Sequence, residues 1–117
     1  MPYVYVNFTF DLNSPSASNL TAIGGHIEFQ DKGVKGIIVY RKSNDEYVAW
    51  DKNCTYQPRN ACATIRVDVN GITATDTCCG STFNIADGNP TRGPAGRQLL
   101  PYRISFSGSL VRITNYQ

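Results

Sequence analysis

Two features are absent from this 117-residue sequence: a long apolar run and a cluster of basic residues. No apolar run approaches the roughly 20 residues that a membrane-spanning helix needs, so no span is expected. The 11 Lys and Arg residues barely outnumber the 9 Asp and Glu residues, and no stripe of basic and aromatic residues is present. Nucleic acid is therefore not an expected partner, because phosphate backbones are bound by such clusters.

Catalytic groups are also scarce. The only histidine, His26, lies far in sequence from the cysteines, and we interpret it as a surface or hydrogen-bonded residue. Ser81 lacks the Gly-x-Ser-x-Gly motif and has no neighbouring histidine to activate it, so a serine hydrolase is not indicated. No general acid–base pair stands out, and a chain of this length fits a single domain, residues 1–117. We therefore predict a protein without enzymatic activity of its own.

The apolar residues that are present recur with a period near two and are interrupted by turn-forming residues. Such a pattern is typical of short β-strands, and no segment shows the long 3.6-residue period of an amphipathic helix. The sequence predicts an all-β, antiparallel fold. The expected strands are 4–10, 24–29, 36–40, 47–50, 102–106 and 110–113, the last two joined by a hairpin turn at 107–109.

Four cysteines are the most informative polar residues. They are Cys54, Cys62, Cys78 and Cys79. An even number of cysteines in a small domain indicates either disulfides in an oxidising compartment or a metal site. Composition alone does not choose between these two.

The cysteines belong to a series of short motifs between Asp51 and Tyr102. This part of the chain resembles the Rieske iron–sulfur domain, whose pattern is Cys-x-His in a first loop and Cys-x-x-His followed by Gly-Ser-x-Phe in a second. The resemblance implies a small antiparallel Rieske-like barrel or sandwich with two cysteine-bearing loops. It is carried by Asp51-Lys52-Asn53-Cys54-Thr55-Tyr56, by Asp76-Thr77-Cys78-Cys79-Gly80-Ser81-Thr82-Phe83, by Asp87-Gly88-Asn89-Pro90, and by Gly93-Pro94-Ala95 followed by Leu99 and Tyr102.

Residue by residue, the ligand positions of the resemblance are mostly changed. A Rieske centre binds one iron through two thiolates and the other through two imidazoles. Cys54 matches the first cysteine, whereas Tyr56 stands at the first histidine position. Asp76 stands at the second cysteine position and Cys79 at the second histidine position. The chain therefore resembles a degenerate member with both histidines replaced, and no bound cofactor is expected.

The resemblance also implies pairings for the cysteines. Many respiratory Rieske domains carry a loop-clamping disulfide at positions that correspond to Cys62 and Cys78. Cys54 and Cys79 would then face each other, and a second disulfide between them is the simplest expectation. A metal held by Cys54 and Cys79, with Tyr56 or Asp76 as weaker ligands, is the alternative: zinc, a single iron or a [2Fe-2S] cluster. A vicinal Cys78–Cys79 disulfide or redox-active pair is a further one.

Three hypotheses on function follow. The first is a non-enzymatic, disulfide-braced structural or binding module that has lost its cluster. The second is an iron–sulfur or other metal-binding electron-transfer protein, a component of an oxidoreductase chain with a redox partner. The third is a thiol–disulfide switch at Cys54 and Cys79. Cysteine usage and the resemblance imply a periplasmic or cell-surface location, as in a lipoprotein tethered near a membrane.

Overall fold

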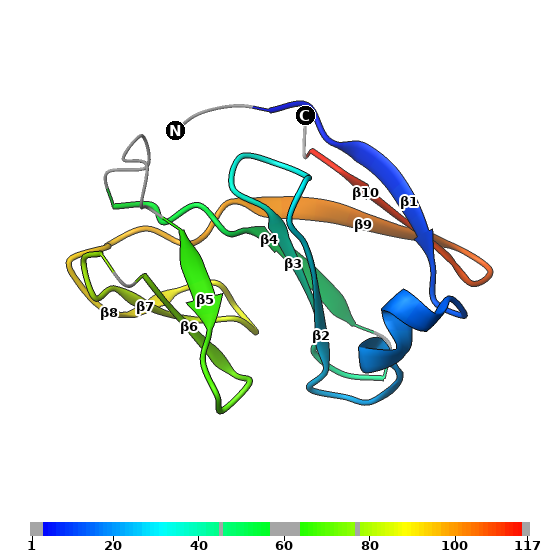
Figure 1. Ribbon diagram of the computed structural model, residues 1–117, viewed down its shortest axis with the longest axis horizontal. Coiled ribbons are helices and arrows are strands. Elements are labelled where there is room, and N and C mark those ends of the chain that lie inside the picture. Colours follow the sequence, from blue (N-terminus) through cyan, green and yellow to red (C-terminus); the bar gives the residue numbers. More distant parts are fainter. Residues whose placement is uncertain (1–3, 45, 57–63, 77, 116–117) are drawn as a thin grey trace.

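Two antiparallel sheets make up the fold of this computed structural model, which describes all residues except 1–3, 45, 57–63, 77 and 116–117. The six-stranded sheet has the order β1-β10-β9-β4-β3-β2 and the four-stranded sheet the order β5-β6-β7-β8 (Figure 1). The predicted all-β antiparallel architecture is confirmed. The strands are β1 (Asn7–Asp11), β2 (His26–Phe29), β3 (Ile37–Arg41), β4 (Tyr47–Asp51), β5 (Ile65–Val67), β6 (Thr73–Asp76), β7 (Thr82–Asn84), β8 (Pro90–Arg92), β9 (Pro101–Ser107) and β10 (Leu110–Thr114).

The six-stranded sheet contains every strand that the sequence predicts. Strands β2, β3 and β4 form a meander, and β9 joins it through the pairs Ala49–Tyr102 and Trp50–Pro101. Strands β9 and β10 form the expected hairpin, with β1 at the outer edge. The predicted strands at 4–10 and 24–29 begin two or three residues later than expected, at Asn7 and His26.

Two elements of the structure were not predicted. One is the short 3-10 helix η1 (Pro15–Thr21), which packs near β2 in Figure 1. The other is the whole four-stranded sheet, which lies in the stretch that the sequence analysis treated only as motifs. Its strands have three or four residues and expose polar side chains such as Arg66 and Arg92, so they show too little alternation to be recognised.

Strand β3 lies between two apolar cores. Ile37 and Val39 pack in the core of the larger sheet, while Ile38 and Tyr40 pack in a second core with Phe83. Successive side chains of a strand point to opposite faces, so a strand that is apolar at every position is buried on both sides. The continuous sequence Ile37-Ile38-Val39-Tyr40 therefore couples the two sheets.

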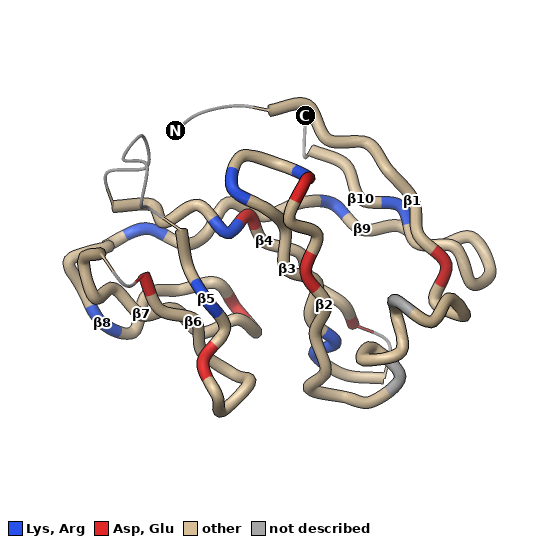
Figure 2. The backbone as a smooth tube through the Cα atoms, viewed as in Figure 1, with Lys and Arg blue, Asp and Glu red and all other residues tan. Residues whose placement is uncertain are grey.

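Among the residues that the structure describes, the charged ones do not gather into a region of one sign. Figure 2 shows Lys and Arg interspersed with Asp and Glu along both sheets. This distribution agrees with the absence of basic clusters from the sequence. In the part of the chain that the structure describes, no helix is long and apolar enough to cross a membrane.

Candidate metal centre

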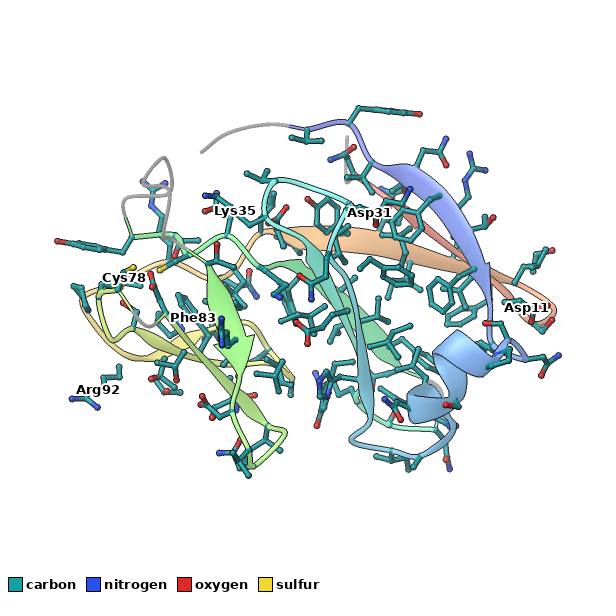
Figure 3. The ribbon with its side chains drawn as sticks, in the orientation of Figure 1. Asp11, Asp31, Lys35, Cys78, Phe83 and Arg92 are labelled. Atoms are coloured by element: carbon teal, nitrogen blue, oxygen red, sulfur yellow. The ribbon has the colours of Figure 1, made fainter. Side chains whose placement is uncertain are left out.

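Two segments far apart in sequence meet at one end of the smaller sheet. Cys54 follows β4, whereas Asp76 ends β6 and Cys79 lies in the turn between β6 and β7. The Sγ atoms of Cys54 and Cys79 are 4.0 Å apart, and Asp76 Oδ2 lies 3.2 Å from Cys79 Sγ. One donor atom from each of these three residues lies within 4.8 Å of the other two. Figure 3 places Cys78 at this end, remote from Asp11 in β1.

Asp51 fixes the segment that leads to Cys54. Its carboxylate is fully buried and accepts four hydrogen bonds. The donors are the backbone N–H groups of Val34 (2.7 Å), Lys35 (3.1 Å) and Asn53 (2.9 Å) and the hydroxyl of Tyr102 (2.6 Å). A buried carboxylate is stable when such donors replace its water. The chain therefore leaves β4 in one defined direction, toward the site.

The β6–β7 turn is closed by Asp76 itself. Asp76 Oδ1 accepts the backbone N–H of Cys78 (2.8 Å), and the Asp76 carbonyl accepts the N–H of Gly80 (2.8 Å). An aspartate that binds the amide two residues later is a common turn-forming device. Because Oδ1 closes the turn, Oδ2 is left to face Cys79. The side chain at the second cysteine position of the resemblance therefore has a structural and a ligand-like role at once.

Ser81 contacts Cys79 and was not predicted as a site residue. Its hydroxyl is buried, accepts the N–H of Ala95 (2.9 Å) and lies 3.1 Å from Cys79 Sγ. The hydroxyl therefore links the β6–β7 turn to the third loop, Gly93-Pro94-Ala95. The Gly-Ser-x-Phe motif could have indicated this role, because it places a small hydroxyl-bearing residue two positions after Cys79.

Cys54 is a buried thiol in a polar setting. Its side chain has no exposed surface, and burial raises its pKa to about 12, with Asp76 adding to the rise. The backbone N–H of Tyr56 opposes this effect by donating a hydrogen bond to the sulfur. A low dielectric and a nearby carboxylate both disfavour the negative thiolate. Without a metal ion, Cys54 is thus held as a neutral thiol.

The structure brings three of the four predicted ligand residues together. Cys54, Asp76 and Cys79 form one cluster, whereas the Tyr56 side chain is 38% exposed and Tyr56 acts on Cys54 through its backbone. Sequence reasoning thus named three residues that the structure places side by side. It could not supply their mutual distances, which depend on how the two segments meet.

The predicted Cys54–Cys79 disulfide is not formed in this structure. Both residues are free thiols, and their 4.0 Å separation is about twice the 2.05 Å length of an S–S bond. The Cys79 thiol instead donates a hydrogen bond to Asp76 Oδ2, and Cys54 lies in the same cluster of donor atoms. Cys78 is disulfide-bonded, so a vicinal bond to the free Cys79 is ruled out here. The predicted partner of Cys78, Cys62, lies outside the described residues.

A histidine-ligated cluster does not fit these residues. The only histidine of the chain, His26, pairs with Tyr40 in the larger sheet, and its ring lies 4.0 Å from Glu28. It is half-buried at the start of β2. A Rieske centre needs two imidazoles on one of its irons, and this site has none to offer.

Several solved structures share this fold, although no family model and no curated protein matches the sequence. The cyanobacterial plasma membrane Rieske protein PetC3 from Synechocystis PCC 6803 has a TM-score of 0.63 and 21% identity, over 95% of this chain and 98% of its own. The ferredoxin of carbazole 1,9a-dioxygenase from Nocardioides aromaticivorans IC177 has a TM-score of 0.56 and 15% identity, over 98% and 99% of the two chains.

A third structure comes from a complex. A chain from the complex of reduced oxygenase and oxidized ferredoxin in carbazole 1,9a-dioxygenase has a TM-score of 0.60 and 18% identity, over 93% of each chain. At these identities the likeness establishes the fold. The chain is a Rieske-fold domain, in agreement with the motif resemblance.

Proposed function

We propose that this Rieske-fold domain is a non-enzymatic electron-transfer protein whose centre is a single iron ion held by Cys54, Asp76 and Cys79. The observation that carries the proposal is the convergence of two thiols and one carboxylate at the end of the smaller sheet. Electron-transfer proteins among its structural neighbours, described as Rieske proteins and ferredoxins, support the assignment. A redox partner protein is part of the same proposal.

The spacing of the donors favours one ion. Metal–sulfur bonds of about 2.3 Å place two thiolates of a single tetrahedral ion about 3.8 Å apart. The Cys54 and Cys79 sulfurs are 4.0 Å apart, so only a small adjustment is needed. Donors on two different irons of a bridged cluster would stand farther apart than this. An iron ion here would supply one-electron chemistry, and the chain supplies the ligands and a largely buried site.

The location outside the cytoplasm, inferred from the sequence, belongs to this proposal as well. Cys78 is disulfide-bonded, and disulfides persist mainly in oxidising compartments. A domain that carries electrons there would meet its partner near the exposed side chain of Tyr56, two residues after Cys54. Non-reducing mass spectrometry of protein isolated from its native cell, compared between cell fractions, tests the location.

Elemental analysis of protein purified without oxygen tests the centre. We expect one iron per chain without acid-labile sulfide, and a reversible one-electron signal in voltammetry. The variants Cys54→Ser and Cys79→Ser should lose the iron, whereas Tyr56→Phe and the surface variant Ser105→Ala should keep it.

Two results would contradict the proposal. Iron with equal sulfide would assign a cluster with an unusual ligand set and overturn the single ion. Zinc, or no metal at all, would overturn electron transfer and leave the first sequence hypothesis, a structural or binding module braced by disulfides.

A further inference from the structure

We propose that the metal-free chain has a second activity: Cys79 and Cys54 form a dithiol pair that reduces an external disulfide and becomes a Cys54–Cys79 disulfide. The activity does not depend on the proposed iron centre, which would occupy the same two sulfurs. It rests on the position, the exposure and the surroundings of the two thiols.

The first observation is the distance between the thiols. The two Sγ atoms lie 4.0 Å apart, and a disulfide requires about 2.05 Å. The sulfurs must therefore approach each other by about 2 Å, a displacement that side-chain rotation and small loop shifts can supply. Both residues are held in segments that already face each other, and both are free.

The second observation is the unequal burial of the pair. Cys54 is fully buried, whereas Cys79 is only partly buried and lies on the β6–β7 turn. In dithiol pairs of this kind, the accessible sulfur meets the substrate and the buried sulfur resolves the mixed disulfide. Cys79 is therefore the entry thiol and Cys54 the resolving thiol.

The third observation is the shared carboxylate. Cys79 Sγ lies 3.2 Å from Asp76 Oδ2 and 3.1 Å from the Ser81 hydroxyl, and Cys54 Sγ lies within 4.8 Å of an Asp76 carboxylate oxygen. The side chain of Asp76 is itself buried and fixed by the N–H of Cys78. One fixed acceptor thus positions both thiols toward the same point.

The exchange balances without any further oxidant. The Cys79 sulfur attacks one sulfur of the external disulfide, the external S–S bond breaks, and the first thiol is released. The Cys54 thiol passes its proton to the neighbouring Asp76 carboxylate as its sulfur attacks the Cys79 sulfur, the mixed disulfide breaks, and the second thiol leaves with that proton. Two protein thiols are oxidised to one disulfide, one external disulfide is reduced to two thiols, and the two thiol protons leave with the products.

Oxidised glutathione is the probe for this activity. Metal-free, folded protein should lose two mass units as it releases two glutathione molecules. Cys54→Ser should stop at a stable glutathione adduct on Cys79, because no resolving thiol remains. Cys79→Ser should react about 100-fold more slowly, since a buried thiol is shielded from the reagent. Ser105→Ala, an exposed position in β9, should react like the unaltered chain.

Three outcomes would overturn the inference. The first is a chain that stays reduced in excess oxidised glutathione while circular dichroism shows it folded. The second is an unresolved adduct on the unaltered chain, and the third is a Cys79→Ser variant that reacts as fast as the unaltered chain. Because the assay uses metal-free protein, its failure leaves the iron proposal untouched. If both proposals hold, iron-loaded protein should not react with oxidised glutathione, because the iron would occupy both sulfurs.

Discussion

The two sheets of this domain are stabilised in different ways. The six-stranded sheet buries aliphatic and aromatic side chains against η1 and along β1, β9 and β10. The four-stranded sheet has short strands with polar outer faces. Its core includes side chains that belong to the larger sheet, such as Ile38 and Trp50. Trp50 also donates its ring N–H to the Ile85 carbonyl at 2.7 Å. The smaller sheet is therefore not expected to be stable by itself, although β6 and the β6–β7 turn carry two of the three site residues, Asp76 and Cys79.

The largest effect is expected for Phe83→Ala, which tests this dependence. Phe83 is fully buried in the core that the two sheets share (Figure 3). Truncating a buried phenylalanine costs about 3–5 kcal/mol of stability. We expect this loss in urea unfolding, with a single transition, because β3 couples both cores. Two separate transitions would show instead that the sheets unfold independently.

A similar loss is expected for Asp51→Ala. The substitution removes the shared acceptor of four hydrogen bonds, of which those from Asn53 and Tyr102 are buried, and a buried group left unsatisfied costs about 1–3 kcal/mol. Some of the donors will bind water, so we expect a total of about 3 kcal/mol. The matched variant Tyr102→Phe removes one donor and leaves the carboxylate three, so it should cost less than half as much. Equal losses in the two variants would show that the hydroxyl of Tyr102 dominates the network.

The contrast between the sheets also explains what the sequence could predict. Alternating segments such as Asn7 to Phe10 and the hairpin at 107–109 signal their strands directly, because local pattern and tertiary burial agree. Strands β6 and β7 give no such signal, since residues such as Thr73 and Thr75 alternate with a single small apolar residue, Ala74. Their pairing depends on the turn that Asp76 closes.

The site shows the same limit. The motif resemblance selected Cys54, Asp76 and Cys79 because these residues occupy ligand positions, and the structure brings them together. The supporting roles of Asp51 and Ser81 were missed, although both stand in the motifs, because their partners are backbone amides of distant segments. The sequence also could not predict whether Cys54 and Cys79 form a disulfide, because this depends on the distance between their sulfurs.

A smaller loss of stability is expected when a glycine at the junction of the sheets is replaced by alanine. Comparing two glycines separates the cost of close packing from the cost of backbone strain. Gly88 has a φ of +74°, and a Cβ there would lie 2.7 Å from the Trp50 ring. Gly108, in the β9–β10 turn, has a similar φ of +62° with nothing within 4 Å of such a Cβ. Gly108→Ala should cost about 1 kcal/mol from strain alone, and Gly88→Ala about 1–3 kcal/mol more. Equal losses in thermal unfolding would show that Trp50 moves aside freely.

The smallest effect concerns pH and the buried thiol of the site. The pKa of Cys54 is raised to about 12 in the folded, metal-free chain, above the ordinary value of about 8.5 in the unfolded chain. The folded state thus binds the thiol proton more tightly. This contribution to stability is complete below pH 8.5 and is lost as pH rises toward 12, by at most about 1.4 kcal/mol per pH unit.

Anaerobic urea unfolding between pH 8 and pH 10 measures this slope. The unaltered chain should lose stability with rising pH more steeply than Cys54→Ala, which has no thiol to ionise on unfolding. The comparison removes the titration of all other groups, because they are common to both proteins. Parallel slopes would mean that the β6–β7 turn and the Cys54 segment admit enough water to solvate a thiolate, and that the site is less enclosed than the larger sheet's core.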